Sequence, residues 1–346
     1  MKKKNLQPVK ITKDCVQAEI TFDTVPVIRS DHSLWLLHPL TSEMCCKFRK
    51  RQREGRRPYW DETEFGPQPK FQKLMENVFM ISAAAMTLAV VKTDGTLLVW
   101  DRMQSGCEDR PAFVKIAEGI KTAESGDGVL LAISRAGTLL YWKKQEQNSY
   151  CGPPEKLMEH VKQVSAGVGH YAALTEDGSL WMWGKNDCAQ LGDGTHTDRH
   201  KPKKIMEHVQ SGVGPGLRGR QLFDCRRLGA RHSAAVDARH RLWMWGDNTF
   251  GQLGTRLSGS RKKPVPVIRN VRKVSLGYSH TGVLDQKNQI WMCGFNGKYG
   301  ALGNTEYRNC RRLRKMKPGG FSVKNLELQA DRAVLVRDGG DVFEWG

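Results

Sequence analysis

The stretch Ala173-Leu174-Thr175-Glu176-Asp177-Gly178-Ser179-Leu180-Trp181-Met182-Trp183-Gly184 predicts a β-hairpin. An apolar run from Tyr171 to Leu174 comes first, and a second run from Leu180 to Trp183 follows the Asp177-Gly178 pair. Asp-Gly favours a two-residue turn, because glycine adopts a positive φ without steric cost. All four positions of the second run are apolar, so we expect neighbouring sheets to cover both faces of this strand.

The second run recurs along the chain and predicts the fold class. Seven copies are present: Leu34–Leu37, Leu97–Trp100, Leu139–Trp142, Leu180–Trp183, Leu242–Trp245, Ile290–Cys293 and Val342–Trp345. A repeat of about 40 to 50 residues built from short strands is typical of a β-propeller with about four strands per blade. We therefore predict an all-β, seven-bladed β-propeller.

A second repeated element predicts the outer edge of each blade. It is clearest as Lys73–Val78, Lys156–Val161 and Lys204–Val209, and nearby prolines favour an edge strand with a tight turn over a helix. The N-terminal copy around Val9–Ile11 has no tryptophan run before it, and the seventh run ends at Trp345. We expect strands from the two chain ends to share one blade, because an unpaired edge would otherwise remain.

Two longer gaps between copies predict insertions in a single domain spanning residues 1–346. One insertion covers residues 41–70 and the other, rich in glycine, covers residues 210–223. If the strands of a blade are lettered A to D along the chain, the first insertion lies between C and D and the second between D and A. The two should project from opposite faces of the ring, with His170, His232 and His280 on the face of residues 41–70.

Composition limits the location of the protein. The 346 residues are 39% hydrophobic, and no apolar run approaches the ~18 residues of a membrane helix. The charged start, Met1–Asn5, lacks the apolar segment of a signal peptide. Nine cysteines without a Cys-x-x-Cys pair indicate reduced and mostly buried thiols, and we expect Cys45-Cys46 to be inert. These features predict a cytoplasmic protein.

Residues 41–70 hold the strongest sequence candidate for a binding site. Seven cations are followed by an aromatic residue: Lys47, Arg49, Lys50, Arg51, Arg53, Arg56, Arg57 and Trp60. Arginine engages carboxylate or phosphate through two hydrogen bonds, and tryptophan supplies an anchor. The alternative is a solvated loop whose charge is balanced by the acidic residues that follow. The net charge of +19 makes acidic proteins, nucleic acid and anionic membranes eligible partners.

Other motifs are expected to be structural. His170, His232 and His280 recur at one repeat position, which favours packing over metal binding. Gly214–Gly219 fits the pattern Gly-x-Gly-x-x-Gly, but the residues that follow lead into another repeat strand instead of the helix that dinucleotide binding requires. We predict no catalytic residues, no cofactor and no metal, and therefore no enzyme.

Several linked motifs resemble one family. Gly167-x-x-His170, Leu174–Gly178, Trp181-x-Trp183-Gly184-x-Asn186 and Gln190–Gly194 together resemble a repeat of the regulator of chromosome condensation family. The resemblance is sharpest from about Lys156 to Gly303. It implies a seven-bladed propeller that works by binding. The founding branch is a guanine nucleotide exchange factor for a small nuclear GTPase and docks on nucleosomes, and other branches are inhibitors or scaffolds. The Gly-Trp-Arg-His-Thr element of the ultraviolet-sensing plant branch is missing here.

Three functions follow as hypotheses. The first is a monomeric, non-enzymatic interaction propeller with a protein partner. The second, from the resemblance, is a guanine nucleotide exchange factor for a small GTPase. The third is a nucleic-acid or chromatin binder that uses its basic loops.

Overall fold

A computed structural model of the chain describes residues 9–12, 14–19, 25–37, 72–84, 87–101, 112–126, 128–144, 150, 152–209, 231–296, 302, 308–316, 323–329 and 332–345. These residues form β-strands and turns and contain no helix. Within the same ranges, nothing resembles a helix that could cross a membrane.

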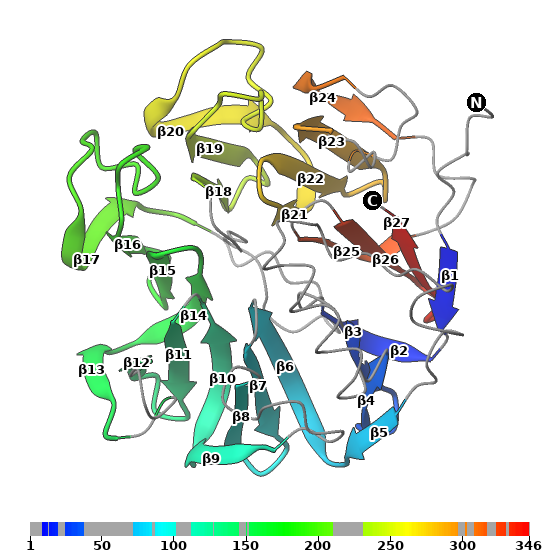
Figure 1. Cartoon of the computed structure of the whole chain (residues 1–346). Coiled ribbons are helices and arrows are strands. Elements are labelled where there is room, and N and C mark those ends of the chain that lie inside the picture. Colours follow the sequence, from blue (N-terminus) through cyan, green and yellow to red (C-terminus); the bar gives the residue numbers. More distant parts are fainter. Residues whose placement is uncertain are drawn as a thin grey trace, which may run out of the picture.

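Seven antiparallel sheets surround a centre and form the blades of a ring (Figure 1). Blade I holds β2 (Cys15–Ala18), β3 (Val25–Arg29), β4 (Leu34–Leu37) and β5 (Gln72–Met75). Blade II holds β6 (Val78–Ala84), β7 (Thr87–Lys92), β8 (Leu97–Asp101) and β9 (Val114–Ala117). Blade III holds β10 (Ile120–Ser125), β11 (Val129–Ser134), β12 (Leu139–Lys143) and β13 (Glu155–Met158).

The remaining blades continue in chain order. Blade IV holds β14 (Val161–Ala166), β15 (His170–Thr175), β16 (Leu180–Gly184) and β17 (Arg199–Met206). Blade V holds β18 (His232–Val236), β19 (Leu242–Gly246) and β20 (Arg261–Ile268). Blade VI holds β21 (Val271–Leu276), β22 (His280–Asp285), β23 (Ile290–Gly294) and β24 (Cys310–Lys315). Blade VII holds β25 (Val323–Gln329), β26 (Arg332–Arg337), β27 (Val342–Trp345) and β1 (Val9–Thr12).

The predicted closure by the two chain ends is confirmed. Strand β1 pairs antiparallel with β27, Val9 opposite Glu344 and Lys10 opposite Phe343. The N-terminal strand therefore supplies the outer edge of the blade that the C-terminal strands begin. Six of the seven tryptophan-type runs are the third strand of their blade, as the repeat predicted, and β19 is the middle one of the three strands that the described residues form in blade V.

The hairpin around Asp177-Gly178 forms, but its turn is longer than predicted. Strand β15 ends at Thr175 and β16 begins at Leu180, so four residues connect them. The Gly178 amide donates to the Thr175 carbonyl at 3.0 Å, and Gly178 has a φ of 80°. The Asp177 carboxylate accepts the Ser179 amide at 2.9 Å. This side-chain contact stabilises a type I-like turn in place of the tighter two-residue loop.

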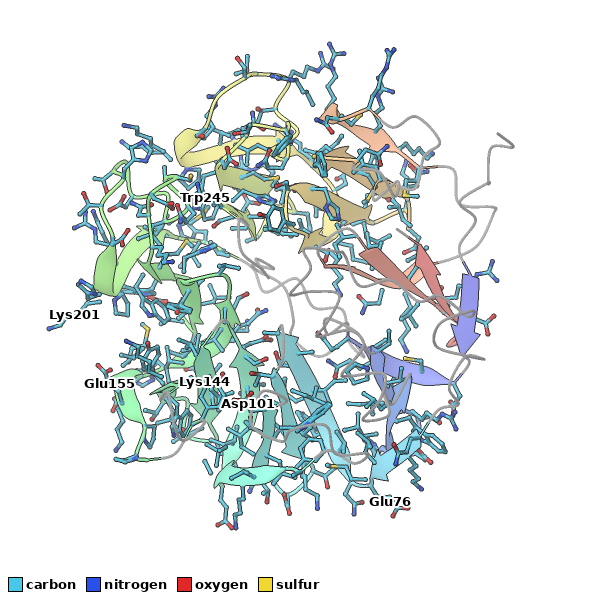
Figure 2. All side chains as sticks on the ribbon, in the orientation of Figure 1. Glu76, Asp101, Lys144, Glu155, Lys201 and Trp245 are labelled. Atoms are coloured by element: carbon cyan, nitrogen blue, oxygen red, sulfur yellow. The ribbon has the colours of Figure 1, made fainter. Side chains whose placement is uncertain are left out.

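The core lies between successive blades. One cluster, for example, joins Val91 and Val99 of blade II to Leu130 and Ala132 of blade III, all four almost fully buried. Trp245 of blade V is fully buried, and its indole N–H donates to the Gln190 carbonyl of blade IV at 2.9 Å (Figure 2). Each blade therefore depends on its neighbour for burial of its apolar faces.

A backbone hydrogen bond joins consecutive blades. The first residue of strand A donates its amide to a carbonyl in the second turn of the preceding blade, and the acceptor residue has a positive φ at each junction. Six junctions follow this rule: Val78 to His32, Ile120 to Gly95, Val161 to Gly137, Val209 to Gly178, Val271 to His240 and Cys15 to Gly340, with N···O distances of 2.9–3.2 Å. The last of these closes the ring between the two chain ends.

Blade V departs from this plan at its inner strand. Val209 forms an isolated bridge with Asp237, in the register that Val161 has with Thr175 in blade IV. Val209 is therefore the first residue of strand A. The glycine-rich insertion at residues 210–223 begins after that residue, and not in the D–A connection where it was predicted. The insertion itself, including Gly214–Gly219, lies outside the described residues.

Two buried histidines hold neighbouring blades together, which agrees with the expected structural role. His170 Nε2 lies 3.3 Å from Ser233 Oγ, and His232 Nε2 lies 3.0 Å from Thr281 Oγ1. The two hydroxyls donate to the carbonyls of Gln190 (2.8 Å) and Gln252 (2.7 Å). Because each hydroxyl proton goes to a carbonyl, each neutral imidazole must donate from Nε2.

The third histidine, His280, has no such hydrogen bond to a described hydroxyl of the next blade. Ala333 pairs with Trp345 in the register that Thr281 has with Cys293, so Ala333 stands where the hydroxyl should be. His280 is fully buried, and neither of its ring nitrogens has a hydrogen-bond partner among the described residues. Burial lowers the pKa of His170 to about 4, of His232 to about 3 and of His280 to about 4. All three rings are therefore neutral at pH 7.

Replacing a glycine that has a positive φ in one of these turns should lower the stability of the fold. We expect Gly137→Ala to lower the free energy of unfolding by about 1–2 kcal/mol, because an alanine at its φ of 82° is strained. No atom lies closer than 3.7 Å to the added Cβ, so a clash is not the cause. Gly339→Ala, at a residue outside the left-handed region and with open space, is the control. Urea titration measures both, and equal losses would contradict the argument.

The buried histidines should make the fold acid-sensitive. Their folded pKa values lie below the unfolded value of about 6.5, so the unfolded chain takes up protons first and stability is lost as pH falls from about 6.5 towards 4. Between pH 7 and 5 we expect His232→Gln to reduce the wild-type loss of unfolding free energy by about 2 kcal/mol. If the free energy of unfolding of His232→Gln fell with pH as steeply as that of the wild type, the argument would be refuted.

Candidate functional site

The A–B and C–D connections share one end of the ring, which we call the loop end. In blade IV the start of β15 and the start of β17 both pair with Gly184, the last residue of β16. The A–B loop therefore lies beside the C–D loop, and the Lys185 amide donates to the Gly169 carbonyl at 2.7 Å. The described loops of this end include residues 185–198 and 247–260 between C and D, and 277–279 between A and B.

A buried asparagine organises each described C–D loop. Asn186 and Asn248 are 0% and 1% exposed, and their Oδ1 atoms accept the amides of Leu191 (2.9 Å) and Leu253 (3.0 Å). Asn296 does the same for Leu302 at 2.8 Å. Leu191, Leu253 and Leu302 are thereby held in the core. Internal hydrogen bonds thus fix the loops at residues 185–198 and 247–260.

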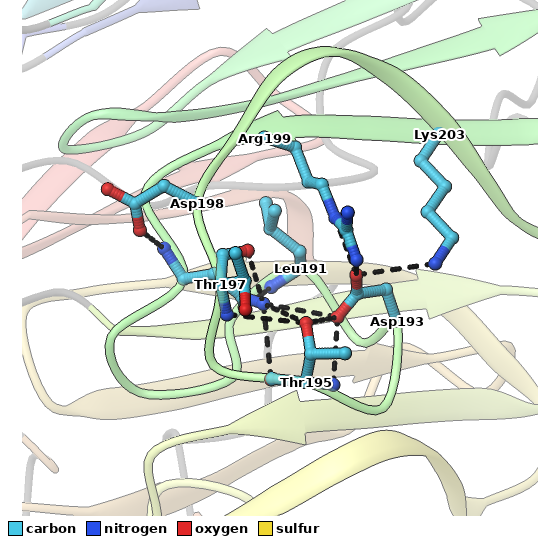
Figure 3. A network of polar contacts seen from close by, with 8 residues as sticks. Leu191, Asp193, Thr195, Thr197, Asp198, Arg199 and Lys203 are labelled. Atoms are coloured by element: carbon cyan, nitrogen blue, oxygen red, sulfur yellow. Dashed lines mark hydrogen bonds and ion pairs between the residues drawn. The ribbon is translucent and has the colours of Figure 1, made fainter.

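Asp193 is the centre of a polar network in the first of these loops (Figure 3). Its carboxylate is buried and accepts hydrogen bonds from Thr195 (2.6 Å), Arg199 (2.9 Å) and Asn186 (3.1 Å). Burial alone would raise the pKa of Asp193, but the hydrogen bonds from Thr195, then Arg199 and Asn186, hold it well below its usual range. The Asp193 carboxylate is therefore negatively charged at pH 7, and both of its oxygens accept hydrogen bonds from the loop and from β17. This arrangement fits a structural role.

An apolar group is exposed on the loop end of blades V and VI. Phe250 and Phe295, on adjacent blades, stack at a tilt with ring centroids 5.0 Å apart, and both are half-buried. Tyr278 is 38% exposed and precedes Ser279, whose carbonyl accepts the Phe295 amide at 2.8 Å. Leu257, in the same C–D loop as Phe250, is 60% exposed. We call Phe250, Leu257, Tyr278 and Phe295 the aromatic corner.

The site predicted from the sequence lies outside the described residues. This holds for Lys50 and for all seven predicted partner-binding residues: Lys47, Arg49, Arg51, Arg53, Arg56, Arg57 and Trp60. The described strands show only where the segment attaches. Strand β4 ends at Leu37 and its hydrogen-bonded neighbour β5 begins at Gln72, so the segment connects strands C and D. His170, His232 and His280 lie at the same end, as predicted, because each opens a strand B there.

The aromatic corner was not predicted from the sequence. Its four residues are separated by up to 45 positions and fall outside the repeated strands, so periodicity does not single them out. Their common feature is a position in loops of the same end on adjacent blades. A search for large apolar residues immediately after each C strand and inside each A–B connection would have found two of them, Phe295 and Tyr278.

The comparisons with known proteins agree with the architecture. The model of the "Regulator of chromosome condensation (RCC1) repeat" matches residues 161–190, and a second model of that repeat matches residues 177–220 and 239–284. The human E3 ubiquitin-protein ligase HERC2 is 30% identical over 190 residues, which are 53% of this chain and 4% of HERC2. The ultraviolet-B receptor UVR8 of Arabidopsis thaliana is 27% identical over 191 residues, 54% of this chain and 41% of the receptor. The matches thus span less than half of these relatives.

Solved structures support the fold. Prp20p of Saccharomyces cerevisiae, described with its binding to Gsp1p and histones, superposes with a TM-score of 0.68 at 15% identity, over 95% of this chain and 81% of that chain. Human WBSCR16 superposes with a TM-score of 0.68 at 16% identity, over 98% and 88%. At these identities the likeness concerns the fold alone. The repeat matches, the seven sheets and the pairing of β1 with β27 lead to one conclusion: this chain is a seven-bladed β-propeller in which residues 161–220 and 239–284 match the repeat of the regulator of chromosome condensation family.

Proposed function

We propose that the chain is a non-enzymatic interaction propeller that binds a protein partner on the loop end of blades V and VI. The observation that carries the proposal is the aromatic corner, where Tyr278 and Leu257 are exposed in loops of the same two blades that carry the stacked Phe250–Phe295 pair. Aromatic residues in the centre of an interface supply most of its binding energy. Large apolar residues exposed at one end of two adjacent blades indicate an interaction site.

The rigidity of the surrounding loops supports the proposal. Asn248 holds the Leu253 amide at 3.0 Å and donates to the Leu257 carbonyl at 2.6 Å, so the loop that carries Leu257 is fixed at both ends. A surface that is ordered before binding loses little conformational entropy when a partner docks. Asp193, His170 and His232 are engaged in hydrogen bonds that hold the ring and its loops. This engagement fits a binding protein better than a catalyst.

The charge beside the corner indicates the chemistry of the partner. Arg256 is exposed next to Leu257 and forms no ion pair with any residue in the described ranges. A guanidinium at the rim of an apolar patch favours a carboxylate that stays partly solvated. The expected partner surface therefore presents apolar side chains with at least one acidic residue beside them.

A double variant tests the corner. The partner is captured from the native host on the immobilised chain, identified by mass spectrometry and purified, and its affinity is then measured by calorimetry. We expect Leu257→Ser with Tyr278→Ala to weaken binding at least about 30-fold, because hot-spot truncation removes about 2 kcal/mol or more. Both side chains are exposed, so the melting temperature should not change.

Val114→Ser is the matched control, since Val114 is 50% exposed on β9 in blade II. It should bind like the wild type. Wild-type affinity in the double variant, or equal losses in the control, would contradict the proposed site. If the partner is a small GTPase, release of labelled nucleotide then tests the exchange activity that the family resemblance implies.

A further inference from the structure

Basic side chains, five of them lysine or arginine, occupy the same two positions on three consecutive outer strands. Arg199, Arg261 and Cys310 are equivalent, because they pair with Gly184, Gly246 and Gly294 at the ends of the three C strands. The next two residues of each outer strand are therefore equivalent as well. They are all exposed, and we call them the basic strip: His200 and Lys201 on β17, Lys262 and Lys263 on β20, and Arg311 and Arg312 on β24.

The strip does not continue into blade III. There the equivalent positions are Gly152 and Pro153, and the β13 strand that follows carries Glu155 beside Lys156. Further along the outer strands β5, β9 and β17, a lysine is paired with a glutamate three residues later: Lys73 with Glu76, Lys115 with Glu118 and Lys204 with Glu207. The side chains of the strip form no ion pair within the described ranges. Residues 248–326 contain sixteen lysines and arginines and only two acidic residues, so most of the net charge of +19 comes from this part of the chain.

Loops fix the strip across the blade boundaries. The Gly194 amide of blade IV donates to the Lys262 carbonyl of β20 at 2.9 Å. The Arg256 amide of blade V donates to the Arg311 carbonyl of β24 at 3.2 Å, and Thr255 bridges to Arg312. Through these loops, β17, β20 and β24 are linked across the blade boundaries. We call this surface of the three outer strands the outer wall. Lys201 projects outward from this wall (Figure 2).

The composition of the wall distinguishes between possible ligands. The exposed large hydrophobic residues of the described ranges are Val16, Val114, Leu257 and Tyr278, and none lies on β17, β20 or β24. A protein partner needs apolar anchors in its interface, and a single nucleic-acid strand needs aromatic rings for base stacking. Phosphate contacts need only lysine, arginine and backbone amides. Pro202, Pro264 and Pro266 also remove amides that an added peptide strand would require.

We propose that the basic strip binds the phosphate backbone of a nucleic-acid duplex on the outer wall of the ring, without reading base sequence. The strip shares no residue with the aromatic corner but adjoins it, because the Arg256 amide of the loop that carries Leu257 donates to the Arg311 carbonyl at 3.2 Å. A rigid row of cations over three blades can contact successive phosphates, and release of their counterions supplies the free energy.

The test uses the full chain and a fluorescein-labelled 24-base-pair DNA duplex of mixed sequence, with anisotropy measured from 50 to 200 mM salt. The variant is Lys262→Ser, Lys263→Ser, Arg311→Ser and Arg312→Ser. We expect its affinity at 50 mM salt to fall more than about tenfold. The slope of log K against log salt should fall by about three to four, roughly 0.9 for each phosphate that the variant no longer neutralises. Scrambling the base sequence of the duplex should leave the affinity unchanged.

The control removes the same charge elsewhere through Lys121→Ser, Lys143→Ser, Lys156→Ser and Lys162→Ser, all at exposed positions of blades III and IV. It should keep affinity within about threefold, and its salt slope should stay near the wild-type value. Equal losses in the two variants would mean that net charge alone attracts DNA and would overturn the proposal. Tighter binding of a single strand, or displacement of the duplex by an equal charge of polyglutamate, would also overturn it.

Two further variants complete the design. His200→Ser with Lys201→Ser should weaken binding in the same direction, which guards against a folding defect in the fourfold variant. Leu257→Ser with Tyr278→Ala should bind the duplex normally. Failure of the strip and failure of the aromatic corner are therefore distinguishable.

Discussion

One backbone hydrogen bond, repeated around the ring, makes the rest of the structure possible. The carbonyl of a left-handed turn residue in one blade accepts the amide that opens the next blade, as Gly137 does for Val161 and Gly340 for Cys15. The positive φ turns the carbonyl towards the neighbour, and an L-residue other than glycine, asparagine or aspartate adopts it at a cost. His32 and His240 adopt it at two junctions. The bond sets where each blade starts, and side-chain contacts between blades follow from that placement.

The contacts at the opposite end of the strands complete the joint. Gln190 in blade IV offers its carbonyl to both Ser233 and Trp245 of blade V, at 2.8 and 2.9 Å. Gln252 does the same for Thr281 and Cys293 of blade VI. A blade is thus held by its neighbour at the turn end through backbone and at the loop end through side chains. The loop residues that join the blades are buried, so exposed side chains of the same end, such as Leu257 and Tyr278, are available for partners.

The sequence predicted the ring because its strongest signals are those that build the ring. Runs such as Leu180–Trp183 are apolar at every position because the strand lies between two neighbouring sheets. An unbroken apolar run can be seen within a single segment of the sequence. The turn after Thr175 was predicted too short, because the Asp177 side chain stabilises a longer loop than the Asp-Gly pair alone favours. The aromatic corner and the basic strip could not be predicted from one segment. Their residues come together only when equivalent positions of adjacent blades are aligned by strand register, as with Lys262 and Arg311.

The shared blade VII has a consequence for how the protein is made. Of the described strands β1 is synthesised first and β27 last, yet each is the other's hydrogen-bonded neighbour. During translation β1 therefore cannot pair until β27 has left the ribosome. A closing contact so distant in sequence slows folding and leaves sheet edges open to other chains in the meantime. The propeller is therefore most vulnerable to aggregation just before β27 emerges, and chaperone protection of that state would determine the yield of folded propeller.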